Sequence, residues 1–331
     1  MRKISVFLLA LVALFLLGAV VLWSKQVPVE YGTEVRPEVE PVEPTMVTIP
    51  EGSFMMGDDP SLDIPDDQRE VRGLGRAPSR IALTSVPVHE VYLSAYSIGK
   101  YEVTNEEYKR FCDATGRPYP RDPDFAEAEP RWQDYLERYP RHPVVMITWD
   151  DMAAYCMWLS DRTGKDYHLP TEAQWEKAAR GGLEGKLYPW GDEREDSVVR
   201  MDLTWTAGPV EVGSFPPSEY GLHDMAGNVI EAVNDWYDEG YYESSPQRDP
   251  LGPSGWANYL SLMSPIERGR MKGRCKVLRG GSFRAPWNWD EQGPDGLFEM
   301  PVRCGARGYV YQRPYTHFDM GFRVALGGVW R

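Results

Sequence analysis

The N-terminal end of the chain is uniformly apolar. Residues 4–23 (ISVFLLALVALFLLGAVVLW) carry no charged side chain and directly follow Arg2 and Lys3. A run of about 20 apolar residues, each rising about 1.5 Å in a helix, is long enough to cross the hydrocarbon core of a bilayer. We therefore expect residues 1–25 to form an uncleaved signal anchor, that is, one transmembrane helix, with a cleaved signal peptide as the alternative.

The charges around this span indicate its orientation. The basic residues and the N-terminal amine precede it, and mainly Lys25 follows it. Basic residues favour the cytoplasmic side, so the rest of the chain is expected on the extracytoplasmic side, in the periplasm or at the cell surface. Residues 26–45 contain four Pro and five Glu and no helical apolar period. Proline restricts the backbone and like charges repel, so this segment is expected to be an extended stalk.

The third part of the chain, residues 46–331, begins with strand patterns. Residues 46–59 (MVTIPEGSFMMGDD) alternate apolar and polar positions and end in Gly and Asp, which is typical of a strand and a turn. Residues 88–105 (VHEVYLSAYSIGKYEVTN) are rich in β-branched and aromatic residues. Such residues favour the half-buried surface of a sheet, so this segment also predicts strands.

Three helices are predicted by one local device. Thr104, Thr148 and Thr171 each precede a helical apolar period and are followed, three residues later, by an acidic or amide side chain. This pattern is a capping box, in which side chains satisfy backbone amides of the first turn. Each period ends at a glycine, which favours a helix C-terminus. The expected buried faces and ends are Tyr108, Phe111, Cys112 and Thr115 before Gly116; Met152, Tyr155, Cys156 and Leu159 before Gly164; and Trp175, Ala178 and Ala179 before Gly181.

Beyond Gly191 the pattern changes to short strands and long loops dense in Gly, Pro, Trp and Tyr, with no further strong helix. Strand and helix patterns that do not alternate regularly predict an α+β domain with little regular secondary structure. No repeat of fixed period is present.

Composition and charge exclude several classes of protein. The chain is 42% hydrophobic and 26% charged, which is typical of a globular protein rather than a disordered or polytopic membrane protein. It has 36 Lys and Arg against 50 Asp and Glu, for a formal charge of −14. Nucleic-acid binding needs a basic surface that can follow phosphates, so we expect no nucleic-acid partner.

The four cysteines leave two alternatives open. An even number of cysteines in an oxidising compartment is compatible with one or two disulfides, and burial as free apolar thiols is the other reading. Their spacing fits neither a zinc ribbon nor one particular pairing. The candidates are Cys112, Cys156, Cys275 and Cys304.

Seven segments resemble, in order, motifs of the formylglycine-generating enzyme, or sulfatase-modifying factor, family. The resemblance covers nearly everything from Met46 to the C-terminus. It implies one domain with that family's fold, a decorated C-type-lectin-like fold. The segments are EVTNEEYKRF (102–111), HPVVMITWDDMAAYCMWL (142–159), LPTEAQWEKAARGG (169–182), YPWGDE (188–193), YGLHDMAGNVIE (220–231), LRGGSF (278–283) and GFRVAL (321–326).

The resemblance also shows what is missing. In the family's copper oxidases, the stretch that begins at the position of Ser282 carries two cysteines five positions apart, which bind Cu(I). Here these positions are Ala285 and Asp290. Soft thiolates suit Cu(I) and the side chains present do not, so we expect neither copper nor formylglycine-generating activity. Cys156 and Cys304 match family disulfide positions, but the partner positions are Val324 and Ala179.

One family metal site is retained in the sequence. The resemblance places a calcium site at Asp224, Gly227, Val229 and Glu231, where two carboxylates and two backbone carbonyls would bind the ion. Calcium takes 6–8 oxygen ligands, so these groups suit it. The alternative is an Asx-turn followed by a solvated Glu. The five histidines show no metal-site spacing.

These features favour one function and leave two others open. The preferred hypothesis is a membrane-anchored, non-catalytic domain that serves as an accessory, binding or assembly subunit of an extracytoplasmic or membrane complex. Its partners would be the membrane, through the N-terminal helix, and other protein subunits. The alternatives are a diverged metal-dependent oxidase or maturation enzyme acting on a secreted protein, and a sensor of a small ligand.

Overall fold

The computed structural model describes residues 39–58, 85–127, 129–201, 208–253, 275–285, 302–311 and 315–330. By its contacts the chain divides into two units, Met1–Glu38 and Val39–Arg331, and the described residues all belong to the second. No helix among them is long and apolar enough to cross a bilayer. The predicted span at residues 4–23 lies outside the described residues.

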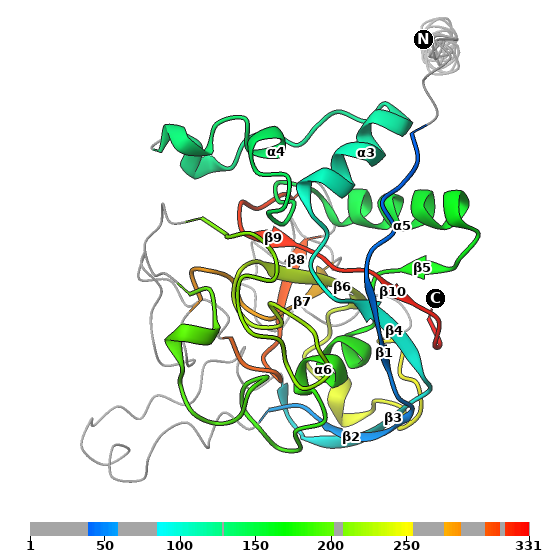
Figure 1. Ribbon diagram of the computed structural model, residues 1–331. Coiled ribbons are helices and arrows are strands. Elements are labelled where there is room, and N and C mark those ends of the chain that lie inside the picture. Colours follow the sequence, from blue (N-terminus) through cyan, green and yellow to red (C-terminus); the bar gives the residue numbers. More distant parts are fainter. Residues whose placement is uncertain are drawn as a thin grey trace, which may run out of the picture. The chain divides into compact units, whose positions relative to one another are not determined.

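The first sheet joins the two ends of the domain. Its four strands lie in the order β1 (Met46–Ile49), β4 (Tyr96–Gly99), β10 (Ala325–Leu326) and β5 (Tyr167–His168). All its pairs are antiparallel, and Ala325 lies opposite both Ile98 and His168. The C-terminal strand is therefore placed between strands that come much earlier in the sequence (Figure 1).

A two-stranded ribbon and a second sheet complete the strands. Strands β2 (Gly52–Met56) and β3 (His89–Leu93) pair antiparallel. The second sheet has the order β8 (Gly308–Tyr311), β7 (Cys275–Arg279), β6 (Ile230–Trp236) and β9 (Met320–Gly321), with β6 and β9 parallel. All five residues of β7 are buried, so this strand carries its charged residues into the interior.

The three predicted helices are confirmed. They are α3 (Asn105–Thr115), α5 (Trp149–Thr163) and α6 (Glu172–Arg180), and each begins with the expected capping box and ends at the expected glycine in the left-handed conformation. The predicted strands are confirmed as β1 to β4. A short helix, α4 (Tyr135–Arg138), and 3-10 turns at Asp124–Ala126, Pro130–Trp132, Asp196–Val198 and Tyr241–Glu243 account for the other helical residues described.

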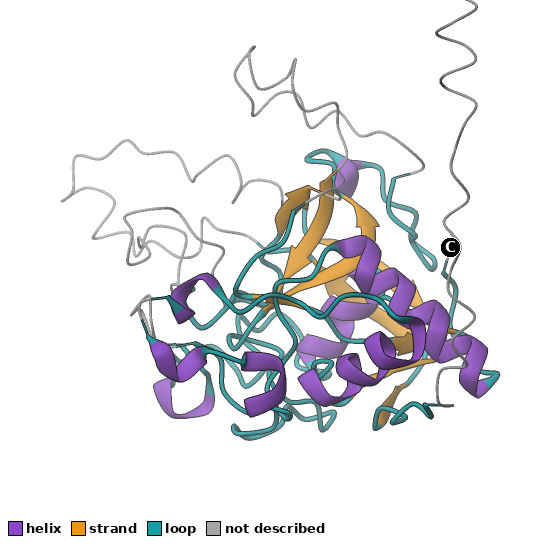
Figure 2. Ribbon diagram, turned by 90° about the horizontal axis from the view of Figure 1, so that it is seen from above, coloured by secondary structure: helices purple, strands orange, loops and turns teal. Residues whose placement is uncertain are grey.

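The expected α+β class with little regular structure is confirmed, since loops take up much of the described chain (Figure 2). Helix α6 differs from the other helices because all nine of its residues are buried. Trp175, at its centre, is fully buried in an apolar cluster with strands of both sheets. A helix inside the domain must bring its polar side chains into contact with other polar groups.

The last seven residues of the predicted stalk lie against the domain. Glu40 forms an ion pair with Arg162 at 2.9 Å, and Glu43 forms one with Lys165. These pairs join residues 39–45 to the C-terminal end of α5. Their side chains are partly exposed, so each pair contributes little to stability.

Candidate functional site

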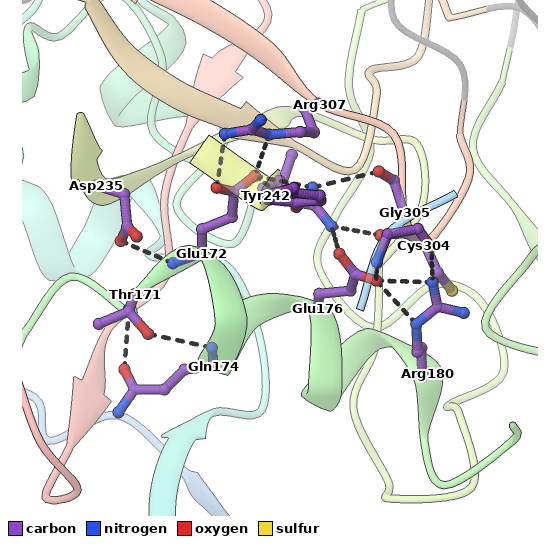
Figure 3. A network of polar contacts seen from close by, with 12 residues as sticks. Thr171, Glu172, Gln174, Glu176, Arg180, Asp235, Tyr242, Cys304, Gly305 and Arg307 are labelled. Carbon is purple, nitrogen blue, oxygen red and sulfur yellow. Dashed lines mark hydrogen bonds and ion pairs between the residues drawn. The ribbon is translucent and has the colours of Figure 1, made fainter. Parts of the chain in front are cut away.

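Helix α6 carries charged side chains into the interior of the domain. The hydroxyl oxygen of Thr171 caps the helix by accepting a hydrogen bond from the backbone amide of Gln174. The side-chain oxygen of Gln174 in turn accepts from the backbone amide of Thr171 (Figure 3). This places Glu172 in the first turn and Glu176 one turn later. Both side chains point toward arginines of other elements.

Glu172 joins three parts of the chain. Its Oε1 accepts from Arg307 Nε at 2.7 Å, from Arg279 Nη1 at 3.1 Å and from the Tyr242 hydroxyl at 3.1 Å. Its Oε2 accepts from Arg307 Nη2 at 3.0 Å. The side chains of Glu172, Arg279 and Arg307 are all at most 1% exposed. A buried carboxylate that binds a guanidinium through both oxygens is strongly held.

Glu176 forms the second half of the network. Its Oε1 accepts from Arg180 Nε at 2.9 Å and from the amide of Gly57 at 2.8 Å, and its Oε2 accepts from Arg279 Nη2 at 2.5 Å. Burial alone would raise the pKa of Glu176, but Arg180, Arg279 and the Gly57 amide outweigh it and hold this pKa below its ordinary value. The network therefore consists of ionised groups that bind one another, and it fixes α6 to β7.

Asp235, on β6, lies at the edge of this network and accepts a hydrogen bond from the amide of Glu172 at 2.8 Å (Figure 3). Burial, together with the nearby Glu172 carboxylate, raises the pKa of Asp235 from 3.8 to about 7. The neutral form is thus favoured in the folded protein, and stability is lost as pH rises toward 7.

We expect Asp235→Asn to flatten this pH dependence. One proton bound only by the folded state changes the free energy of unfolding by about 1.4 kcal/mol per pH unit. Between pH 5 and 7 the free energy of unfolding of the wild type should fall by about 1.4 kcal/mol per pH unit relative to that of the variant. Urea unfolding at each pH measures both free energies. Asp161→Asn, on the exposed face of α5, is the control and should follow the wild type. If the free energy of unfolding changed with pH in the same way for the wild type and for Asp235→Asn, the prediction would be contradicted.

The predicted calcium turn has an unusual backbone. Asp224, Gly227 and Asn228 all have positive φ, at 57°, 76° and 56°. A side chain at Gly227 would place its Cβ 2.3 Å from the carbonyl oxygen of Arg200, so only glycine fits there. Oδ2 of Asp224 accepts from the amide of Gly213 at 2.7 Å, while its buried Oδ1 has no hydrogen-bond partner.

Glu231, at the other end of the turn, is already paired. Arg323 donates to its Oε1 from Nη2 at 2.6 Å and to its Oε2 from Nε at 2.7 Å, and Trp175 Nε1 donates to Oε2 at 2.8 Å. Both Glu231 and Arg323 are buried. The structure thus shows Glu231 in an ion pair, and not the solvated side chain that the alternative reading of the turn assumed.

A third carboxylate, Glu102, approaches the same turn. It accepts from Nδ2 of Asn228 at 2.6 Å and from the amide of Val229 at 3.2 Å. Burial and the carboxylates of Asp224 and Glu231 raise the pKa of Glu102 well above its ordinary value. The sequence reading did not include Glu102, although it lies in one of the family motifs, because its contacts to the turn span more than 120 residues.

The turn meets one condition for a cation site. An unpartnered buried carboxylate oxygen and three acidic side chains lie near a single guanidinium, and burial and carboxylate crowding raise the pKa values of Asp224 and Glu102, so a bound cation would favour the ionised forms of these two groups. Among the described residues, no group of three or more His, Cys, Asp or Glu side chains is arranged to hold a metal. A site here would therefore need backbone carbonyls as well, as the sequence predicts for Gly227 and Val229.

The predicted calcium turn, from Asp224 to Glu231, lies beside the segment that carries Ser282 and Ala285. Gly227 donates its amide hydrogen to the carbonyl of Gly280 at 2.9 Å, and Phe283 donates to the carbonyl of Asn228 at 2.9 Å. Ala285 is 1% exposed and packs in an apolar cluster with Tyr188, Val199, Ala226 and Val302. Asp290 lies outside the described residues.

Ser282 belongs to a polar chain that the sequence reading missed. Its hydroxyl donates to Oδ2 of Asp319 at 2.7 Å, and Oδ1 of Asp319 contacts Nδ1 of His317. Burial raises the pKa of Asp319, but the contacts with His317 and Ser282 and the charge of Arg284 outweigh it and hold this pKa below its ordinary value. His317 and Asp319 are separated by one residue and precede the last family motif, which is a weak signal by itself.

The four cysteines are free and buried in the structure, as in the second of the two alternatives. Burial raises the pKa of the Cys112, Cys275 and Cys304 thiols to about 12. Burial also raises the pKa of Cys156. Thiols of this kind stay protonated near neutral pH, and the thiolate is the form that binds metal.

The sequence matches a known protein family over most of its length. The family model described as the sulfatase-modifying factor enzyme 1-like domain matches residues 32–327. The chain belongs to this family. The solved structure of PvdO from Pseudomonas aeruginosa is similar to this chain: it is 28% identical and superposes with a TM-score of 0.58, covering 86% of this chain and 94% of that one.

Relatives of this family member differ in length and activity. Formylglycine-generating enzyme from Streptomyces coelicolor is 30% identical over 72% of this chain and 78% of its own length. Inactive C-alpha-formylglycine-generating enzyme 2 of Mus musculus is 29% identical over 65% and 75%. Serine/threonine-protein kinase pkn1 of Chlamydia pneumoniae is 32% identical over 76% of this chain, but the chain spans only 35% of that kinase. The family thus includes enzymes, an inactive member and longer proteins.

Proposed function

We propose that this protein is a membrane-anchored, extracytoplasmic and non-catalytic member of the sulfatase-modifying factor family, acting as an accessory, binding or assembly subunit of an extracytoplasmic or membrane complex. The observation that carries the proposal is Ala285. Where the resemblance places the first copper cysteine, a methyl group packs among apolar side chains. Such a surrounding offers no thiolate to Cu(I).

The remaining parts of the proposal have separate support. The apolar run at residues 4–23 has the length of a membrane span, and the Pro- and Glu-rich segment after it favours a spacer. An inactive relative shows that the family contains proteins named for the loss of the enzyme activity. A kinase relative that is much longer shows that this domain also occurs joined to other parts.

Copurification tests the accessory role. Full-length protein would be extracted gently from its native membranes through an affinity tag, and the proteins that accompany it would be quantified by mass spectrometry. The matched control is a tagged chain that carries residues 1–45 without the domain. Stoichiometric companions retained by the full chain and not by the control are expected. A solitary protein would contradict the accessory role and favour the enzyme and sensor alternatives.

We also propose that the turn from Asp224 to Glu231 holds a structural calcium ion. Asp224 would contribute its unpartnered Oδ1, Gly227 and Val229 their carbonyls, and Glu231 an oxygen not fully used by Arg323. Glu102 would fix the turn through Asn228 and Val229. The ion would offset the burial and the carboxylate crowding that raise the pKa values of Asp224 and Glu102.

Calcium is expected to raise the thermal unfolding midpoint relative to chelator. An ion at 100 times its dissociation constant stabilises the native state by about 2.7 kcal/mol. Asp224→Gly should remove the difference, because it removes the proposed ligand oxygen and suits the positive φ at this position, and Asp113→Gly, at a half-buried acid on α3 that pairs with Lys109, should keep it. Glu231 is a poor probe because its loss would also leave Arg323 unpaired. An unchanged midpoint in the wild type would leave the segment an ordinary turn.

A further inference from the structure

A cavity of about 160 Å³ lies beside the C-terminal half of α6. One wall is β2, at Ser53–Met55, and another is the turn at Gly182–Gly185, with Tyr220 completing the lining. Lys177 and Arg180 contribute the cationic part of the lining. Among the described residues, neither the predicted calcium turn from Asp224 to Glu231 nor Ser282 and Ala285 lines this cavity.

Lys177 is a buried cation without a carboxylate partner in the part of the chain that the structure describes. The residue is 5% exposed, and its ammonium group donates to the carbonyls of Pro50 at 2.7 Å and Gly52 at 2.8 Å. An ammonium group has three hydrogens, so one remains for another acceptor. Burial lowers the pKa of Lys177, and the charges of Asp249 and Glu51 offset this only in part. A buried charge without an opposite charge is costly.

By contrast, the charge of Arg180 is balanced by the carboxylate of Glu176. It donates to Glu176 from Nε and Nη2, and to the carbonyls of Gly57 and Lys186. The uncompensated charge at the cavity is therefore the single charge of Lys177. Glu184, the acidic residue in the lining, is exposed to solvent on the turn.

The rest of the lining mixes polar and apolar groups. Its apolar residues are Phe54, Met55, Leu183 and Tyr220. Gly182 and Gly185 have φ of 85° and 67°, and a Cβ at Gly182 would lie 3.3 Å from the Tyr220 hydroxyl. Side chains at these positions would narrow the cavity. An engineered apolar cavity of about 150 Å³ holds one benzene molecule, so one six-membered ring is the right size here.

We propose that this cavity binds a small monocarboxylate about the size of benzoate, whose carboxylate pairs with Lys177. One ammonium balances one negative charge, which favours a monoanion over a phosphate dianion.

Fluorine NMR on the full-length protein tests the proposal with 4-fluorobenzoate as the probe and 4-fluorobenzamide as its neutral isostere. Saturable binding of the benzoate is expected, with a dissociation constant on the order of 1 mM or tighter, as about ten non-hydrogen atoms can supply. The benzamide and the variant Lys177→Met should each bind at least about tenfold more weakly, since a charge-assisted hydrogen bond is lost. Lys177→Arg should retain binding.

A second variant covers the case in which Lys177→Met fails to fold, since it also leaves two carbonyls without a donor. Leu183→Trp keeps the charge and fills the cavity, so it should abolish binding while the thermal midpoint stays close to that of the wild type. No saturable binding by the wild type, equal affinity for the benzamide, or undiminished binding by folded Leu183→Trp would each overturn the proposal. None of these results depends on whether the protein is an accessory subunit.

Discussion

After incubation with copper, the protein is expected to leave a cysteine peptide of the sulfatase type unoxidised. Family oxidases use two thiolates for Cu(I), and here Ala285 and Asp290 stand at those positions. Ala285 is enclosed by apolar side chains, and the four thiols present are buried with raised pKa values. Without a pair of thiolates at these positions, the segment lacks the soft ligands that hold Cu(I) in those oxidases. The effect is all or none, because oxygen activation depends on the bound copper.

The measurement is mass spectrometry of the peptide after incubation with protein, Cu(I) and oxygen, looking for conversion of cysteine to formylglycine. The Streptomyces coelicolor enzyme, a relative of this chain, serves as positive control. Turnover by this protein would show that it is an enzyme. Repeating the assay with Cys275→Ser and Cys304→Ser would then show whether these two thiols supply the metal site.

Replacing Glu172 by glutamine is expected to remove much of the stability of the fold. The variant keeps the size of the side chain but leaves Arg279 and Arg307 without one of their negative partners in a dry interior. Removing one partner of a buried ion pair costs about 3–5 kcal/mol. Domains are stable by only about 5–15 kcal/mol, so this loss would be large.

Urea unfolding followed by tryptophan fluorescence measures the effect, because Trp175 is buried on the same helix. The matched control is Glu106→Gln, which removes a partly exposed ion pair with Arg110 on α3 and should cost a few tenths of a kcal/mol. Equal midpoints for Glu172→Gln and Glu106→Gln would mean that the buried network adds no net stability.

The sequence determined those elements that depend on neighbouring residues. Each predicted helix begins with a capping box and ends at a glycine, and all of these contacts span five residues or fewer. The first strands follow from local alternation in the same way. The order of the motifs was sufficient to identify the family, and therefore to predict the α+β fold, because the motifs are spread over nearly the whole domain.

Only the tertiary structure decided how the charged residues combine. Glu172, Arg279 and Arg307 were visible in the sequence, yet their contacts join positions more than 100 residues apart. Glu102 contacts the predicted calcium turn across 126 residues, and Asp319 contacts Ser282 across 37. The single uncompensated charge of Lys177 likewise depends on which carbonyls and carboxylates surround it. Burial and pairing decide the chemistry of an ionisable group, and both depend on contacts that no local pattern encodes.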